Sequence, residues 1–142
     1  MGKSSRKVVR LLVSRWNELV TSALRDGAID ELKSAGIKAK VVEVPGTWEV
    51  PIVAQKLLQS HDGVVALGCI MQGATNHAGL LAGDVSSALM KLMMESGKPI
   101  TWGIITPETA EQAFERAGLK MGNKGREAAG ALLSVMDALD ES

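Results

Sequence analysis

The sequence predicts an α/β fold in which helices cover both faces of a parallel sheet. Short apolar segments alternate along the chain with longer segments whose apolar residues recur at helical spacing. Apolar strands of this kind are typical of parallel sheets that are buried on both faces. Hydrophobic residues make up 46% of the 142 residues and aromatic residues only 3%, so the chain can bury one core, which must be aliphatic.

The first half of the chain contains two strand–helix pairs. Lys7–Val13 is an apolar, β-branched run that predicts the first strand. Glu18–Ala35 predicts a helix that stops before Gly36, a residue type common just after a helix C-terminus. Ala39–Val44 predicts the second strand. Glu49–Gln59 predicts the second helix. Its proline, Pro51, falls in the first turn, where proline is tolerated.

The middle of the chain predicts a third strand, a long helix and a fourth strand. Gly63–Cys69 is an uninterrupted apolar strand. His77–Glu95 has apolar residues at every third or fourth position, which indicates a helix with one apolar face. Pro99–Ile105 is the fourth apolar strand.

The last part of the chain predicts two helices. Thr106 starts the first of them with a hydroxyl cap followed by proline, and Gly118 ends it. After a loop over Lys120–Gly125, Arg126–Leu139 forms the last helix. The whole pattern predicts a flavodoxin-like three-layer sandwich, a four-stranded parallel sheet of order 2-1-3-4 with helices on both faces. We expect residues 1–142 to form one domain, with residues 1–6 flexible.

Composition excludes several classes of protein. The 16 basic and 16 acidic residues balance, so we expect no nucleic-acid partner. No apolar run approaches the roughly 20 residues of a membrane helix, so we expect no membrane contact. The single cysteine excludes an internal disulfide and fits a cytoplasmic location. One cysteine and two histidines make a metal site improbable, and we predict none.

Ligands of open parallel sheets bind beyond the carboxyl ends of the strands, so these four ends predict the site. After the first strand come Trp16 and Asn17. The indole could form a flat wall of a crevice, or it could be a packing residue at the start of the helix. After the second strand come Thr47, Trp48 and Glu49, which suit a polyol and a flat heterocycle but could equally be ordinary helix-capping residues.

The third strand is followed by a turn that half-resembles a phosphate loop. Ala74 stands where that loop has its lysine, so a nucleotide triphosphatase is improbable. The backbone at Ala74 and Thr75 could still hold one phosphate. His77 follows directly and is the side chain best suited to proton transfer near neutral pH, although a lone histidine is usually structural. We expect Cys69 to be a buried apolar residue whose backbone lines the site.

Trp102 and Arg116 complete the candidate set. A tryptophan inside a strand is usually core, but the glycine beside Trp102 leaves room for a flat ligand or another chain. Arg116 could clamp a phosphate or could simply favour a helix dipole. Lys120 and Lys124 could add positive potential. His61, at the exit of a helix, receives no role.

At this point the chain resembles the lumazine synthases, a family of riboflavin biosynthesis. The matching segments are Ser14–Glu18 (SRWNE), Val44–Pro51 (VPGTWEVP), Val64–His77 (VVALGCIMQGATNH), Ser96–Thr106 (SGKPITWGIIT) and Glu111–Ala129 (EQAFERAGLKMGNKGREAA). Their order and spacing agree with the family over nearly the whole chain, including 25 residues from His77 to Trp102 and 14 from Trp102 to Arg116.

The resemblance implies a reaction and a set of residue roles. The reaction condenses 5-amino-6-(ribitylamino)uracil with 3,4-dihydroxy-2-butanone 4-phosphate to 6,7-dimethyl-8-ribityllumazine, with loss of phosphate and water and without a cofactor. His77 would be the general acid and base. The residues that would hold the uracil and its ribityl chain are Trp16, Asn17, Thr47, Trp48, Glu49, Cys69, Ile70, Met71 and Trp102. The residues that would hold the phosphate are Ala74, Thr75 and Arg116, with possible support from Lys120 and Lys124.

The resemblance also implies a homo-oligomer whose sites lie between adjacent subunits. We expect a pentamer and leave a decamer or a 60-subunit shell open. The chain departs from the family at Gln72, where an arginine is usual, and at Ala78 and Gly79, where the family often has an aromatic residue and an acid. Two alternatives are a non-catalytic protein that binds flavin or lumazine and a shell-forming homologue. A flavodoxin-type electron carrier would need a hydroxyl-rich loop after the first strand, which this chain lacks.

Overall fold

The computed structural model describes residues 7–73, 77–118 and 122–142, which form one parallel sheet and its flanking helices. The strands are β1 (Val9–Ser14), β2 (Lys40–Val44), β3 (Gly63–Cys69) and β4 (Ile100–Ile105). The helices are α2 (Glu18–Ser34), α3 (Val50–Leu57), α4 (His77–Ser96), α5 (Ala110–Arg116) and α6 (Lys124–Asp140), and a short 3₁₀ helix, η1 (Thr47–Glu49), precedes α3. None of these helices is long and apolar enough to cross a membrane.

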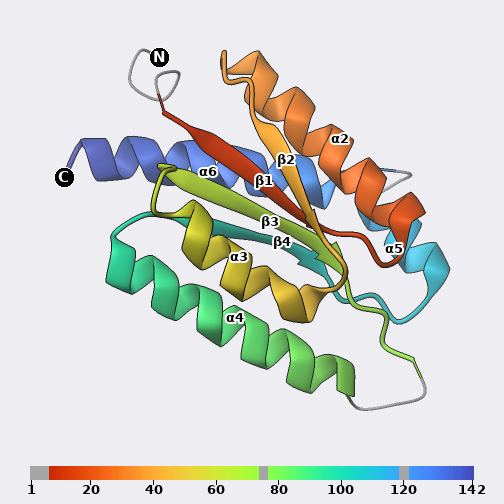
Figure 1. The fold of residues 1–142 in the computed structure, drawn as a ribbon. Coiled ribbons are helices and arrows are strands. Elements are labelled where there is room, and N and C mark those ends of the chain that lie inside the picture. The colour runs from red at the N-terminus through yellow and green to blue at the C-terminus, as the bar shows by residue number, and fades with distance from the viewer. Residues whose placement is uncertain (1–6, 74–76, 119–121) are drawn as a thin grey trace.

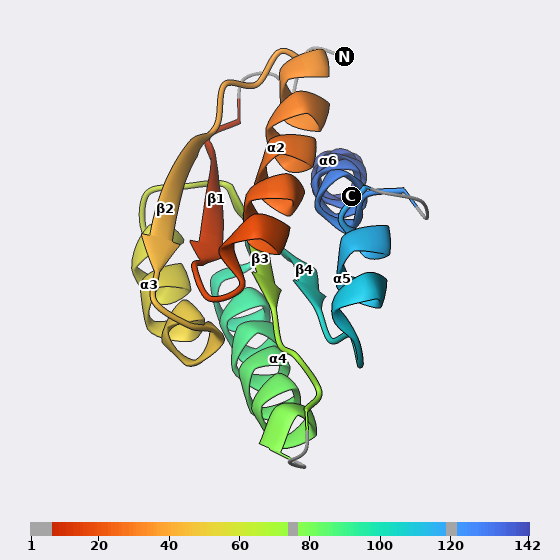
Figure 2. The same cartoon turned by 90° about the vertical axis from the view of Figure 1, so that its right-hand side faces the viewer.

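The sheet order is β2-β1-β3-β4, and all three strand pairs are parallel. Helices α2 and α6 cover one face, while α3 and α4 cover the other (Figures 1 and 2). The predicted flavodoxin-like sandwich, with its strand order and its helices on both faces, is therefore confirmed.

The core is aliphatic, with one large cluster on each face of the sheet and a smaller third cluster among α2, α5 and the ends of β3 and β4. Leu12, Val64 and Ala66 pack toward α3 and α4, whereas Leu11 and Val65 pack toward α2 and α6. Every residue of β3 is buried, because β3 has a strand on each side and helices above and below it. This burial on all sides explains why the sequence of β3 is a continuous apolar run.

Several element boundaries differ from the sequence-based prediction, because side-chain caps decide them. The fourth helix, α5, begins at Ala110 and not at Thr106, since the Thr109 hydroxyl accepts a hydrogen bond from Gln112 N at 3.1 Å. The last helix begins two residues earlier than predicted, since Asn123 Oδ1 accepts from Arg126 N at 3.0 Å. Lys124 and Gly125 are therefore helical, not part of a loop.

Other shifts are smaller. The second helix is divided into η1 and a shorter α3, and β1 starts at Val9 instead of Lys7. The predicted flexibility of residues 1–6 concerns a segment outside the described residues.

Candidate functional site at the carboxyl edge of the sheet

The turn after β1 presents an exposed indole on a fixed backbone. Asn17 adopts a left-handed conformation with a φ of 67°, and its Nδ2 donates to Cys69 O at 3.1 Å. This bond ties the end of β1 to the end of β3, so the Asn17 amide positions the turn. Trp16 is 66% exposed, so much of its indole surface is open to solvent.

The turn after β2 brings Gly46 and Glu49 against the same indole. A Cβ atom on Gly46 would come within 2.9 Å of Trp16 Cζ3, so only glycine lets the ring lie this close to the backbone. Glu49 Oε1 accepts a hydrogen bond from Gly46 N at 2.9 Å. One carboxylate oxygen therefore caps the turn, which is the capping role that the sequence also allowed for Glu49. The other oxygen has no hydrogen-bond partner among the described residues. Sequence reasoning missed Gly46, although its Pro-Gly turn was the signal.

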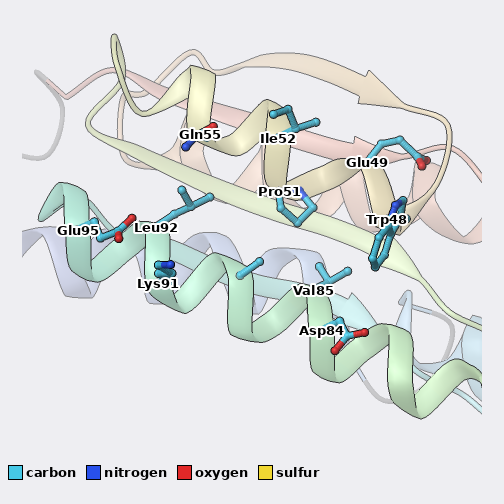
Figure 3. A pocket seen from close by; sticks show the side chains of 11 residues that line it. Trp48, Glu49, Pro51, Ile52, Gln55, Asp84, Val85, Lys91, Leu92 and Glu95 are labelled. Atoms are coloured by element: carbon cyan, nitrogen blue, oxygen red, sulfur yellow. The ribbon is translucent and has the colours of Figure 1, made fainter.

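Thr47 and Trp48 follow in η1 with opposite environments. Thr47 is buried at 4% exposure, whereas Trp48 is 65% exposed. Trp48 stands at one end of a groove of about 660 Å³ between α3 and α4 (Figure 3). The groove continues along Pro51, Ile52 and Leu92. Sequence reasoning missed this groove, because the exposure of an apolar residue such as Ile52, which is 67% exposed on its rim, follows from the packing of the helices and not from the local sequence.

The segment after β3 is held by its backbone. Ile70 N donates to Ile105 O at 2.8 Å, and Gln72 Nε2 donates to Thr106 O at 2.6 Å. The glutamine that departs from the family pattern therefore fastens this segment to the end of β4. Cys69 is buried, as predicted, and its thiol lies 3.8 Å from the sulfur of Met71.

His77 is the first residue of α4 and is exposed. Its position after β3 places it at the carboxyl edge of the sheet, the edge to which the predicted site was assigned. The two residues predicted to hold phosphate, Ala74 and Thr75, lie outside the described residues, as does Lys120.

A second hollow, of about 430 Å³, gathers the remaining candidates. Trp102, Arg116 and Lys124 all line it. Trp102 is 40% exposed, because β4 is an edge strand and no further strand covers it. Arg116 lies in the last turn of α5, where its positive charge interacts favourably with the helix dipole. Its place is therefore compatible with a phosphate clamp and with a purely structural charge.

The structure therefore divides the candidates into two groups. The first group, with Trp16, Trp48 and Glu49, belongs to the turns after β1 and β2, and the second belongs to β4, α5 and the start of α6. Figure 2 shows α5 on the far side of the sheet from η1 and α3. Within the described part of the chain, no group of three His, Cys, Asp or Glu side chains could hold a metal ion.

The fold defines an α/β protein of the flavodoxin-like class, and the candidate site lies at the carboxyl ends of its parallel strands, where ligands of such folds bind. The chain belongs to the 6,7-dimethyl-8-ribityllumazine synthase family, whose family model matches residues 7–140. It is similar to the 6,7-dimethyl-8-ribityllumazine synthase of Nitratidesulfovibrio vulgaris (strain DSM 19637 / Miyazaki F), with 39% identity over 136 residues, which cover 92% of this chain and 87% of that relative.

Proposed function

We propose that the protein condenses 5-amino-6-(ribitylamino)uracil with 3,4-dihydroxy-2-butanone 4-phosphate to form 6,7-dimethyl-8-ribityllumazine in riboflavin biosynthesis. Family membership over residues 7–140 is the observation that carries this proposal. The proposal includes a cytoplasmic location, since the single cysteine, which is buried and unpaired, fits a reducing compartment. It also includes one domain that spans residues 1–142.

The exposed indoles of Trp16 and Trp48 stack on or flank the flat uracil, and the free oxygen of Glu49 receives polar groups of the ribityl chain. Thr47 and the backbone of Cys69, Ile70 and Met71 contribute the remaining contacts. The Asn17–Cys69 hydrogen bond attaches the turn after β1 to the end of β3, and Trp16 N donates to Pro45 O at 3.2 Å in the turn after β2. These bonds support the assignment, because a pre-formed crevice loses little entropy on binding.

His77 transfers the protons. The 5-amino nitrogen attacks the ketone carbon, and water leaves as the imine forms. Loss of the proton from the adjacent carbinol carbon then lets the phosphate leave with the electrons of its C–O bond, and the resulting enol becomes a ketone. The ribitylamino nitrogen attacks this carbonyl and closes the second ring with loss of water. Arg116 balances the phosphate charge together with the turn at Ala74 and Thr75. Proximity and orientation supply much of the acceleration, so no cofactor takes part.

The active site is proposed to lie between two subunits of a homo-oligomer, with a pentamer as the basic ring. Two features support this proposal. The candidate residues fall into two separate hollows, so one copy offers Trp48 and Glu49 while the next offers Trp102 and Arg116. The α3–α4 groove is also lined largely by apolar atoms, and a second copy of the chain is its proposed occupant.

A His77→Ala variant tests the proposal with purified protein and both substrates. We expect kcat to fall roughly 10²- to 10⁴-fold, as for loss of a general acid or base, while the affinity for the uracil changes little. Lumazine fluorescence reports turnover, and a Ser87→Ala variant on the same helix serves as the matched control. Absence of turnover in the unmodified chain, with the uracil still bound, would instead support a binding or shell-forming homologue.

A further inference from the structure

A basic hollow lies at the amino edge of the sheet, away from the carboxyl edge that carries the candidate active site. Its volume is about 270 Å³. Its walls are formed by the start of β1, the link between α2 and β2, and His61, which follows α3. Apart from valine and isoleucine, the residues that line the hollow are Lys7, Arg10, Gly36, Lys38, Lys40 and His61.

The charge of this hollow is one-sided. Four of its lining residues are cationic and none carries a carboxylate, although the chain as a whole has a net charge of zero. Lys7 is offset by Asp140, whose Oδ1 lies 3.2 Å from Lys7 Nζ. Within residues 7–73, 77–118 and 122–142, Arg10, Lys38 and Lys40 form no ion pair. A concave surface with three unneutralised cations attracts an anion.

A buried histidine fixes the orientation of Arg10. The Arg10 Nε–H can only donate, and it lies 3.3 Å from His61 Nε2, so this ring nitrogen is the acceptor. The ring proton is therefore on Nδ1, which donates to Leu57 O at 2.9 Å. His61 is only 8% exposed. The fixed ring accepts the hydrogen bond from Arg10 Nε and so orients the guanidinium. Both Nη groups of Arg10 have no partner among the described residues.

The sheet register adds a second cation to the same place. Arg10 and Lys40 are directly paired across β1 and β2, so their side chains emerge on one face of the sheet. A pre-oriented guanidinium beside an ammonium group matches the geometry of a phosphate, which accepts paired hydrogen bonds from arginine.

We propose that this hollow binds a small phosphate-bearing anion, such as orthophosphate or pyrophosphate, through Arg10 and Lys40, with His61 as the positioning residue. The volume admits a phosphate or diphosphate group and not a polymer, and the site is independent of the proposed reaction.

The test is a calorimetric titration of the oligomer with inorganic phosphate and with pyrophosphate, at constant ionic strength. Because Arg116 is proposed to hold phosphate at the active site, the titrations use the Arg116→Gln chain, in which that binding is removed. The variants below are made in this background. We expect Arg10→Gln/Lys40→Gln to weaken the remaining binding roughly tenfold or more, the loss of one or two charge-assisted hydrogen bonds. Lys33→Gln/Lys56→Gln, which removes two exposed charges outside the hollow, should bind as the Arg116→Gln chain does.

A His61→Leu variant tests the positioning role, because it keeps all four cations. We expect it to weaken pyrophosphate binding while the net charge stays the same. Turnover should be unchanged when His61→Leu, Arg10→Gln/Lys40→Gln or Lys33→Gln/Lys56→Gln is made in a chain with Arg116 intact. Equal affinities in the Arg10/Lys40 variant and its control would overturn the proposal. So would equal binding of acetate and phosphate, since the site would then be no more than a diffuse positive potential.

Discussion

The Cys69 thiol is buried at 4% exposure, and this burial raises its pKa from 9.0 to about 11. Below pH 9 the thiol is protonated in both folded and unfolded chains. Between pH 9 and 11 the unfolded chain releases the proton first, so the free energy of unfolding falls as the pH rises.

Urea unfolding across this pH range measures the effect. We expect stability to decline by about 2–3 kcal/mol more in the unmodified chain than in Cys69→Ala, two pKa units being worth roughly that amount. Parallel pH profiles for the two proteins would contradict the assigned burial.

Candidate residues could be identified from the sequence because the fold places the ends of all four strands at one edge. Their contacts could not. Nothing in the sequence shows that the Asn17 amide is bonded to Cys69 O, because that contact joins positions 52 residues apart. Nor does it show that Gly46 is needed for close approach of Trp16, which depends on how two turns meet.

At the scale of elements, the contact between α2 and α6 depends on small residues. Gly125 lies in the first turn of α6, and a Cβ atom there would overlap the backbone of Leu24. At Gly130, on the same helix, a Cβ atom would meet only Glu31 Oε2, at an ordinary contact distance of 3.6 Å. The two glycines therefore have opposite packing environments.

Alanine substitution at each glycine separates packing from helix propensity. We expect Gly125→Ala to destabilise the fold by about 1–3 kcal/mol, since a backbone carbonyl cannot move aside without parting the helices. Gly130→Ala should raise stability by up to about 1 kcal/mol, the usual gain from replacing a helical glycine. Chemical denaturation measures both, and destabilisation of equal size at the two positions would contradict the packing argument.

Strands and long helices were predictable because hydrophobic periodicity reflects burial over many residues. The start of α5 was not, because Thr106 and Thr109 both precede helix-compatible residues and only the tertiary path selects Thr109 as the cap. The start of α6 was missed for a similar reason. Asn123 also donates to Ala23 O at 2.9 Å, a contact with another helix that local sequence does not encode.

At the scale of the whole molecule, the separation of the candidate residues into two hollows predicts complementation between inactive subunits. His77→Ala and Arg116→Gln each remove one half of the proposed shared site. In randomly mixed rings, about a quarter of the interfaces would pair an intact His77 with an intact Arg116, and turnover should recover to about that fraction. Co-expression of two different His77 variants is the control, which should recover nothing. No recovery in the first mixture would place both groups in one subunit.

The strand order was predictable because parallel connections follow few topological rules. The assembly was not, since apolar exposure such as that of Ile52 and Trp102 depends on which elements leave a face uncovered.

Complete burial of β3 has a consequence for motion. Its amide protons lie between two neighbouring strands and beneath helices on both faces, so solvent deuterium should replace them only when the sheet opens as a unit. The amides of β2, an edge strand in which only Val44 is buried, should exchange through much smaller openings. The carbonyl of Cys69, which accepts the hydrogen bond from Asn17, thus belongs to the slowest-opening strand, so this anchor of the turn after β1 should persist while the edge of the sheet at β2 opens and closes.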